Sequence, residues 1–152
     1  MRSLAEIAVS LWLGAMGLFA FVVAPAAFAT LDREAAGRFV ATVFPRYYLV
    51  GLVLGLVALA GLVGRWLARG GRPWDWLPLL LVLLMLSLTA YAGAVVLPAA
   101  QTAREAMRRA PADVTSEAAA RFARLHRRSV ILNGAVMVAG AVFVALQAAR
   151  RR

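Results

Sequence analysis

The chain is a series of long apolar runs separated by short polar segments. Four of these runs contain no charged residue, and they cover residues 7–31, 47–64, 76–103 and 129–149. A helix that crosses a bilayer needs about 20 mostly apolar residues, within a range of about 17–25. None of the runs alternates as a transmembrane strand does, and backbone groups in lipid must bond within the protein. The pattern therefore predicts an all-α integral membrane four-helix bundle that forms one domain.

Tyrosines and prolines near the ends of the runs help to set the boundaries of the predicted spans. Tyr47 and Tyr48 open the second run and are suited to the headgroup level. Pro25 and Pro98 lie near the ends of the first and third spans, where the missing backbone donor is expected to kink or stop a helix. The predicted spans are residues 4–28, 46–64, 76–97 and 126–147.

A polar segment between the first two spans predicts a further, short helix. Asp32 is a suitable N-cap for residues 33–43, and Leu31 and Phe39 fall on one apolar face of that segment. Pro45 is then suited to the first turn of the second span. We expect a short amphipathic helix that lies at the membrane interface or folds back over the bundle.

The fourth helix is expected to extend beyond the membrane. Thr115 is a suitable cap, and no proline interrupts residues 116–147. At 1.5 Å per residue this helix is about 48 Å long, whereas the hydrocarbon core is about 30 Å thick. The excess length must project on the side of the connection between the third and fourth spans.

Composition supports a membrane setting and excludes some chemistry. The 152 residues are 63% hydrophobic, with a formal net charge of +10. All the basic residues are arginines between or beside the spans, a pattern typical of lipid headgroup contact rather than nucleic-acid binding. They occur on both sides of the predicted membrane, so the orientation of the termini stays open. The chain has no cysteine, which excludes disulfides and thiolate metal sites. The absence of lysine and the alanine and arginine bias indicate a bacterial protein, for which we predict the inner (plasma) membrane.

The fourth span carries a polar stripe that cannot comfortably face lipid. Phe122, His126, Ser129 and Asn133 follow one another at spacings of four, three and four residues. The stripe should face the bundle, where interhelical hydrogen bonding is the simplest interpretation. We predict a polar groove formed by Tyr47, Tyr48, Tyr91, His126, Ser129 and Asn133.

His126 is the single histidine, and it suggests one alternative function. A metal site normally needs several donors, so one histidine argues against a metal centre. No nucleophile–base pair, phosphate loop or paired carboxylates appear. We therefore predict no catalytic residue, no metal and no cofactor. The alternative is a haem- or metal-linked redox protein that uses His126.

Several motifs resemble the transmembrane protein 205-like domain family, which is also described as a domain of unknown function. The first half carries Trp12-Leu13-Gly14, Pro25-Ala26-Ala27-Phe28, Ala36-Gly37 and Phe44-Pro45-Arg46-Tyr47-Tyr48; the second half carries Phe122-Ala123-Arg124-Leu125-His126, Ser129 and Asn133. The resemblance implies a four-span membrane protein. The eukaryotic member that gives the family its name is associated with platinum-drug resistance, which implies export or trafficking but no catalytic residues.

These observations predict a multi-pass membrane protein that is not an enzyme. We expect a scaffold, a partner subunit or a minor transport component, surrounded by the lipid bilayer. Glycine-rich helix faces would permit a homo-oligomer or contact with other membrane proteins. A second alternative is an oligomeric exporter of hydrophobic or metal-complex solutes.

Overall fold

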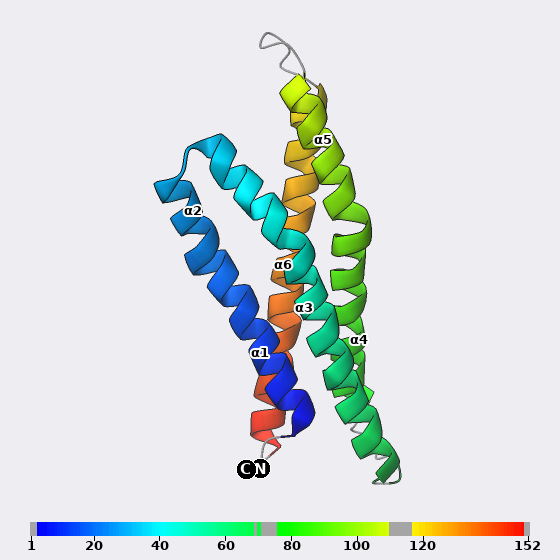
Figure 1. The fold of residues 1–152 in the computed structure, drawn as a ribbon. Helices are drawn as coiled ribbons and strands as arrows, with labels where there is room; N and C mark the ends of the chain where they lie inside the picture. Colours follow the sequence, from blue (N-terminus) through cyan, green and yellow to red (C-terminus); the bar gives the residue numbers. More distant parts are fainter. Residues whose placement is uncertain (1–2, 69, 71–75, 110–116, 151–152) are drawn as a thin grey trace.

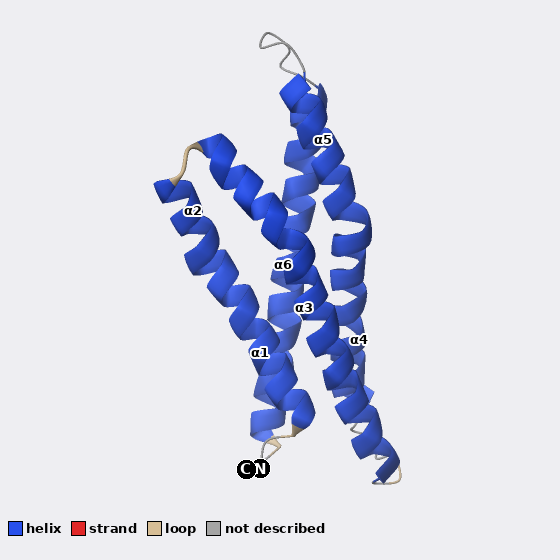
Figure 2. Ribbon diagram, in the orientation of Figure 1, coloured by secondary structure: helices blue, strands red, loops and turns tan. Residues whose placement is uncertain are grey.

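In the computed structural model, residues 3–68, 70, 76–109 and 117–150 are described. The described elements are all helical, and they form four long rods that lie side by side (Figures 1 and 2). The chain begins and ends at the same end of the bundle (Figure 1). The elements are α1 (Leu4–Leu18), the π-helical turn η1 (Phe19–Val23), α2 (Ala24–Thr30), α3 (Arg33–Ala68), α4 (Trp76–Tyr91), the π-helical turn η3 (Ala92–Val96), α5 (Leu97–Arg109) and α6 (Glu117–Ala149).

Each rod is long and apolar enough to cross a membrane. The four candidate spans are Leu4–Thr30, Arg33–Ala68, Trp76–Arg109 and Glu117–Ala149. The protein is thus a multi-pass membrane protein, and the predicted all-α four-helix bundle is confirmed. The 33 residues of α6 make a helix about 50 Å long, so the predicted extension beyond the hydrocarbon core is also present. Thr115, the predicted cap of this helix, lies outside the described residues.

Pro25 and Pro98 do not end their helices. Each follows a single π-helical turn, in which the backbone N–H of Ala24 bonds to Phe19 and that of Leu97 bonds to Ala92. A π turn adds a residue to one helical turn, which gives the chain room to bend before a proline that lacks a donor. The first and third rods therefore run on as helices through both prolines.

The predicted short amphipathic helix is not a separate element. Its residues are helical, but they form the first part of α3, which continues through Pro45 to Ala68. Asp32 caps α3 as expected, because its Oδ1 accepts hydrogen bonds from the backbone N–H groups of Glu34 at 2.9 Å and Ala35 at 2.8 Å. Pro45 thus lies inside a helix rather than at its first turn, with packed residues on both sides of it. These include the buried Ala36 before the proline and the buried Tyr48 after it.

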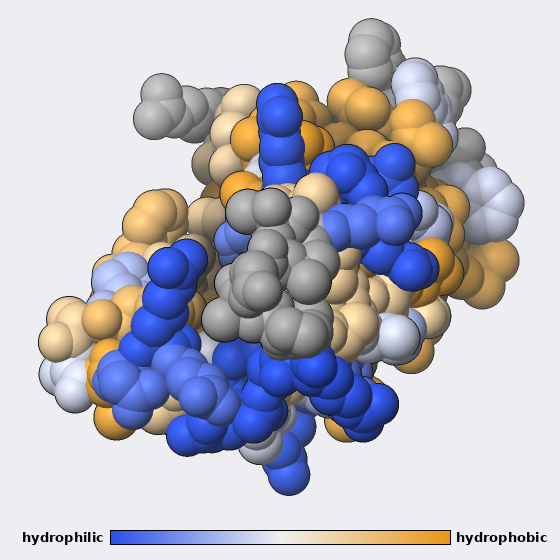
Figure 3. Space-filling view, turned by 90° about the horizontal axis from the view of Figure 1, so that it is seen from above, coloured by the Kyte–Doolittle hydropathy of each residue, from blue (hydrophilic) through white to orange (hydrophobic). Residues whose placement is uncertain are grey.

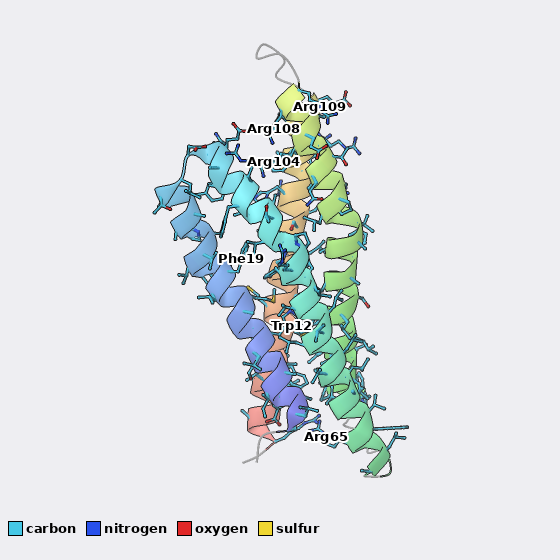
Figure 4. The ribbon with its side chains drawn as sticks, viewed as in Figure 1. Trp12, Phe19, Arg65, Arg104, Arg108 and Arg109 are labelled. Atoms are coloured by element: carbon cyan, nitrogen blue, oxygen red, sulfur yellow. The ribbon has the colours of Figure 1, made fainter. Side chains whose placement is uncertain are left out.

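The core centres on Trp12, which lies between α1 and α3 (Figure 4). The indole ring of Trp12 packs against Gly51 and Gly55 of α3, which are one helical turn apart. A Cβ atom at Gly51 would lie 2.7 Å from Trp12 Nε1, and one at Gly55 would lie 2.8 Å from Trp12 Cζ3. The pair thus permits close packing within one chain. The other large buried side chains of this core include Val9, Met16, Val82, Met85, Val136 and Phe143.

Arginines of α5 hold the start of α3 at the opposite end from the termini. The Arg104 guanidinium donates hydrogen bonds to the backbone oxygens of Gly37 and Glu34, the latter at 3.3 Å. Arg108 forms a salt bridge of 3.0 Å with the Glu34 carboxylate. In Figure 4, Arg104 and Arg108 extend from α5 toward the beginning of α3. These contacts tie the amphipathic part of α3 to the third rod.

Candidate functional site: a polar and aromatic cluster between the spans

Two consecutive tyrosines of α3 bond to two polar residues of α6. The Tyr47 hydroxyl donates a hydrogen bond to Asn133 Oδ1 at 2.9 Å. The Tyr48 hydroxyl lies 3.1 Å from Ser129 Oγ, and either group is able to donate. Ser129 and Asn133 are one helical turn apart, so both face α3 at neighbouring heights. We call Tyr47, Tyr48, Ser129 and Asn133 the polar cluster.

Asn133 connects the members of the polar cluster to one another. Its Nδ2 donates to the backbone oxygen of Ser129 at 2.8 Å and to the Tyr48 hydroxyl at 3.1 Å. Its Oδ1 already accepts from Tyr47. Both ends of this carboxamide are therefore engaged, as a polar side chain among apolar spans requires. The cluster works as a neutral clamp between α3 and α6.

Aromatic rings surround the clamp and bring in the first span. The ring centroid of Phe19, in η1, lies 5.3 Å from that of Phe44 and 5.2 Å from that of Tyr47. The Tyr47 and Tyr48 centroids are 5.2 Å apart at an interplanar angle of 74°. Edge-to-face and tilted pairs at such distances are favourable for aromatic rings. Phe19 is labelled on the first rod in Figure 4.

The third span reaches the same place through Gly93, in η3. A Cβ atom at Gly93 would lie 3.2 Å from the Tyr48 Cβ, so Tyr48 packs directly against this glycine. All four spans thus meet at the two tyrosines. Both π turns contribute a contact residue, Phe19 from η1 and Gly93 from η3. Single π turns in α-helices often occur at functional positions.

Two residues of the predicted groove lie outside this cluster. Tyr91 is 46% exposed, because the stripe that it shares with Ser87 and Ala94 points away from the bundle. Thr89 is the buried polar residue of α4 instead. His126 is exposed, and its ring stacks on Phe122 with centroids 6.1 Å apart. At about 100° per residue, His126 keeps nearly the angular position of Asn133 on α6, but it lies seven residues, or about 10 Å, closer to the start of that helix, outside the polar cluster.

Phe19 and Gly93 were not predicted from the sequence as members of this site. Their sequence signal is weak, since phenylalanine and glycine are common in membrane spans. The two prolines that follow the π turns were the available signal, because each marks a helix that must deform a few residues earlier.

The site contains two phenols, one hydroxyl and one carboxamide, and none of these groups is charged at neutral pH. Among the described residues, no three His, Cys, Asp or Glu side chains are grouped so as to hold a metal ion. The site is therefore suited to hydrogen bonding and ring packing. A haem- or metal-linked redox role of His126 stays the alternative hypothesis.

Comparison with known proteins gives one family. The family model described as domain of unknown function DUF4149 matches residues 7–109, which is more than half of the chain. The match includes Tyr47 and Tyr48 and ends before α6. No curated protein and no solved structure matches the chain.

Proposed function

Because the chain belongs to the family described as domain of unknown function DUF4149, we propose its function from its own structure. The protein is a non-enzymatic scaffold or partner subunit that binds other membrane proteins in the bacterial inner membrane. The observation that supports this proposal is the mutual hydrogen bonding of Tyr47, Tyr48, Ser129 and Asn133. These polar groups bond to one another within the bundle, which leaves its outer surface for interaction.

The narrower resemblance to the transmembrane protein 205-like group is part of this proposal. Two of the motifs behind that resemblance have packing roles in the structure. Trp12 fills the space above Gly51 and Gly55, and Tyr47 and Tyr48 join α3 to α6. Such roles agree with motifs that preserve a bundle rather than a reaction.

The outer face of the first rod is suited to a partner helix. Its exposed residues recur at alternating spacings of three and four, as in helices that pack at a shallow crossing angle. Gly14 has no atom within 4 Å of the position that a Cβ would occupy, so a second backbone is able to approach there. The stripe consists of Leu4, Ile7, Leu11, Gly14, Leu18, Phe21, Pro25 and Phe28.

Photocrosslinking in native membranes tests this proposal. A benzophenone amino acid replaces Phe21, which is 72% exposed on the stripe, or Val138 of α6, which is 65% exposed and serves as the matched control. We expect a discrete protein adduct from position 21 and none from position 138. Coexpression of two differently tagged copies separates a second copy of this chain from another membrane protein. Equal adducts from both positions, or no protein adduct from position 21, would contradict the proposal.

A further inference from the structure

Most arginines at the end of the bundle away from the termini belong to two groups. In the first group, Arg38 of α3 and the three arginines of α5 have partners within the described residues. The Arg38 and Arg108 guanidinium groups form salt bridges with the Glu34 carboxylate, at 2.7 Å and 3.0 Å respectively. The Arg109 guanidinium lies 3.9 Å from the Glu105 carboxylate. Arg104 bonds to backbone oxygens of α3. Arg104 and Arg108 thereby join α5 to α3, whereas the pairs of Arg38 and Arg109 each lie within one helix.

The second group consists of four arginines on α6, which are Arg121, Arg124, Arg127 and Arg128. All four are exposed, and within the described part of the chain no side-chain hydrogen bond or salt bridge joins their guanidinium groups to another residue. Figure 3 views this end of the molecule and shows strongly hydrophilic residues beside hydrophobic surface. Because their side chains are exposed, a ligand from outside the protein is able to reach these guanidinium groups.

The depth of these arginines is set by the apolar run that follows them. Residues 129–149 contain no charged side chain and cover about 31 Å as a helix, which matches the hydrocarbon core of about 30 Å. Arg127 and Arg128 directly precede this run. Their guanidinium groups consequently lie at the level of the lipid phosphates.

Arg124 and Arg127 also share a face of α6 with three exposed apolar residues. Ile131, Val138 and Val142 continue the same face at helical spacings, and they are 60%, 65% and 44% exposed. A molecule lying along this face meets guanidinium groups at the membrane surface and hydrocarbon below. That arrangement complements an amphiphile with an anionic head.

We propose that Arg124, Arg127 and Arg128 bind the phosphate headgroup of an anionic phospholipid, whose acyl chains lie on Ile131, Val138 and Val142. Guanidinium groups bind phosphate oxygens in a bidentate manner, and clustered basic residues at the membrane surface select anionic lipids. A lipid with two phosphates engages more of the arginines than a lipid with one. The apolar face directly below the arginines favours a lipid over an acidic protein segment.

Native mass spectrometry of the purified full chain in detergent tests this proposal. The probes are cardiolipin, phosphatidylglycerol and phosphatidylcholine, and the variant is Arg124→Gln/Arg127→Gln. The matched control is Arg108→Gln/Arg109→Gln, which removes the same charge from the same end of the bundle. We expect wild type and control to retain cardiolipin most strongly, and the α6 variant to bind it about 30-fold more weakly. Equal losses in both variants would mean a general charge effect and would overturn the proposal. Retention by the α6 variant, or equal retention of phosphatidylcholine by wild type, would overturn it too.

Two further experiments use the wild-type chain alone. The first asks whether the bound phosphate belongs to a lipid headgroup or to a free anion, and the second locates the bound lipid on the protein. Inorganic phosphate at millimolar concentration should not displace cardiolipin, and full displacement would indicate a site for free anions instead. A photoactivatable cardiolipin analogue in nanodiscs of the wild-type chain should label residues 124–142 of α6 more than any other exposed segment. Labelling spread evenly over the four rods would contradict the site.

Discussion

The hydroxyl of Tyr47 bonds to Asn133 across 2.9 Å, although the two residues are separated by 86 positions in the chain. The hydroxyl of the next residue, Tyr48, lies 3.1 Å from Ser129 Oγ. Ser129 precedes Asn133 by one turn of α6. Two adjacent residues of one helix thus hold two successive turns of another. A slip of α6 by one turn, about 5.4 Å, would break both contacts, so the polar cluster fixes the relative height of α3 and α6.

Close packing of α3 against Trp12 predicts unequal effects of glycine substitutions. A Cβ atom at Gly51 would force the Trp12 indole ring to move, and one at Gly55 would displace both Leu86 and that ring; such overpacking costs about 1–3 kcal/mol. Gly64→Ala is the control, because no atom lies within 4 Å of its Cβ position. Unfolding by sodium dodecyl sulfate in mixed micelles should show both core variants to be less stable than Gly64→Ala. Equal stabilities of all three would show that Trp12 does not occupy this position.

The cap at Asp32 predicts a pH-dependent start of α3. The hydrogen bond from the Ala35 N–H, followed by the bond from Glu34, holds the pKa of the Asp32 carboxyl below its ordinary value of 3.8. The capping stabilisation is therefore present above that value and is lost as the pH falls through the lowered pKa. Amide hydrogen exchange at Glu34 and Ala35 should accelerate in that acidic range for wild type. Asp32→Asn keeps a neutral cap and should show no such step, whereas Asp32→Ala should exchange faster at every pH.

The contacts of Arg104 predict that one side chain restrains the amphipathic part of α3. Arg104→Ala removes the hydrogen bonds to Gly37 and Glu34. Since the chain has no cysteine, nitroxide labels are easily placed at Phe39 and Met107, which are both exposed. The distance distribution between the labels should broaden in Arg104→Ala. Arg109→Ala, which removes only an exposed pair within α5, is the control and should leave the distribution unchanged.

The four long apolar helices were predictable because a helix that crosses the lipid needs a long apolar run. Charge-free runs of the necessary length occur in the sequence, and each became part of a rod. The inward stripe of Ser129 and Asn133 followed from helical periodicity and from the high cost of polar groups facing lipid. The cap at Asp32 followed from its side chain and its place before an amphipathic segment.

Tertiary packing decided the features that the sequence did not predict. Pro45 was expected to begin a helix, yet α3 continues through it, since residues on both sides of the proline are packed in the bundle. Tyr91 was expected to face inward, but on α4 the inward positions are Met85 and Thr89. Phe19 and Gly93 meet the tyrosines through π turns, and a deformed turn arises from contacts between spans that lie far apart in sequence.

A double-mutant cycle on Tyr47→Phe and Asn133→Leu tests the central claim that the polar cluster holds α3 and α6 together. Unfolding free energies would be measured for wild type, both single variants and the double variant in mixed micelles. We expect a favourable coupling of about 0.6–1.7 kcal/mol, the range seen for hydrogen bonds between membrane helices. The control cycle of Tyr91→Phe with Asn133→Leu should give no coupling, because Tyr91 lies outside the cluster. Absence of coupling between Tyr47 and Asn133, or equal coupling in the control, would contradict the account.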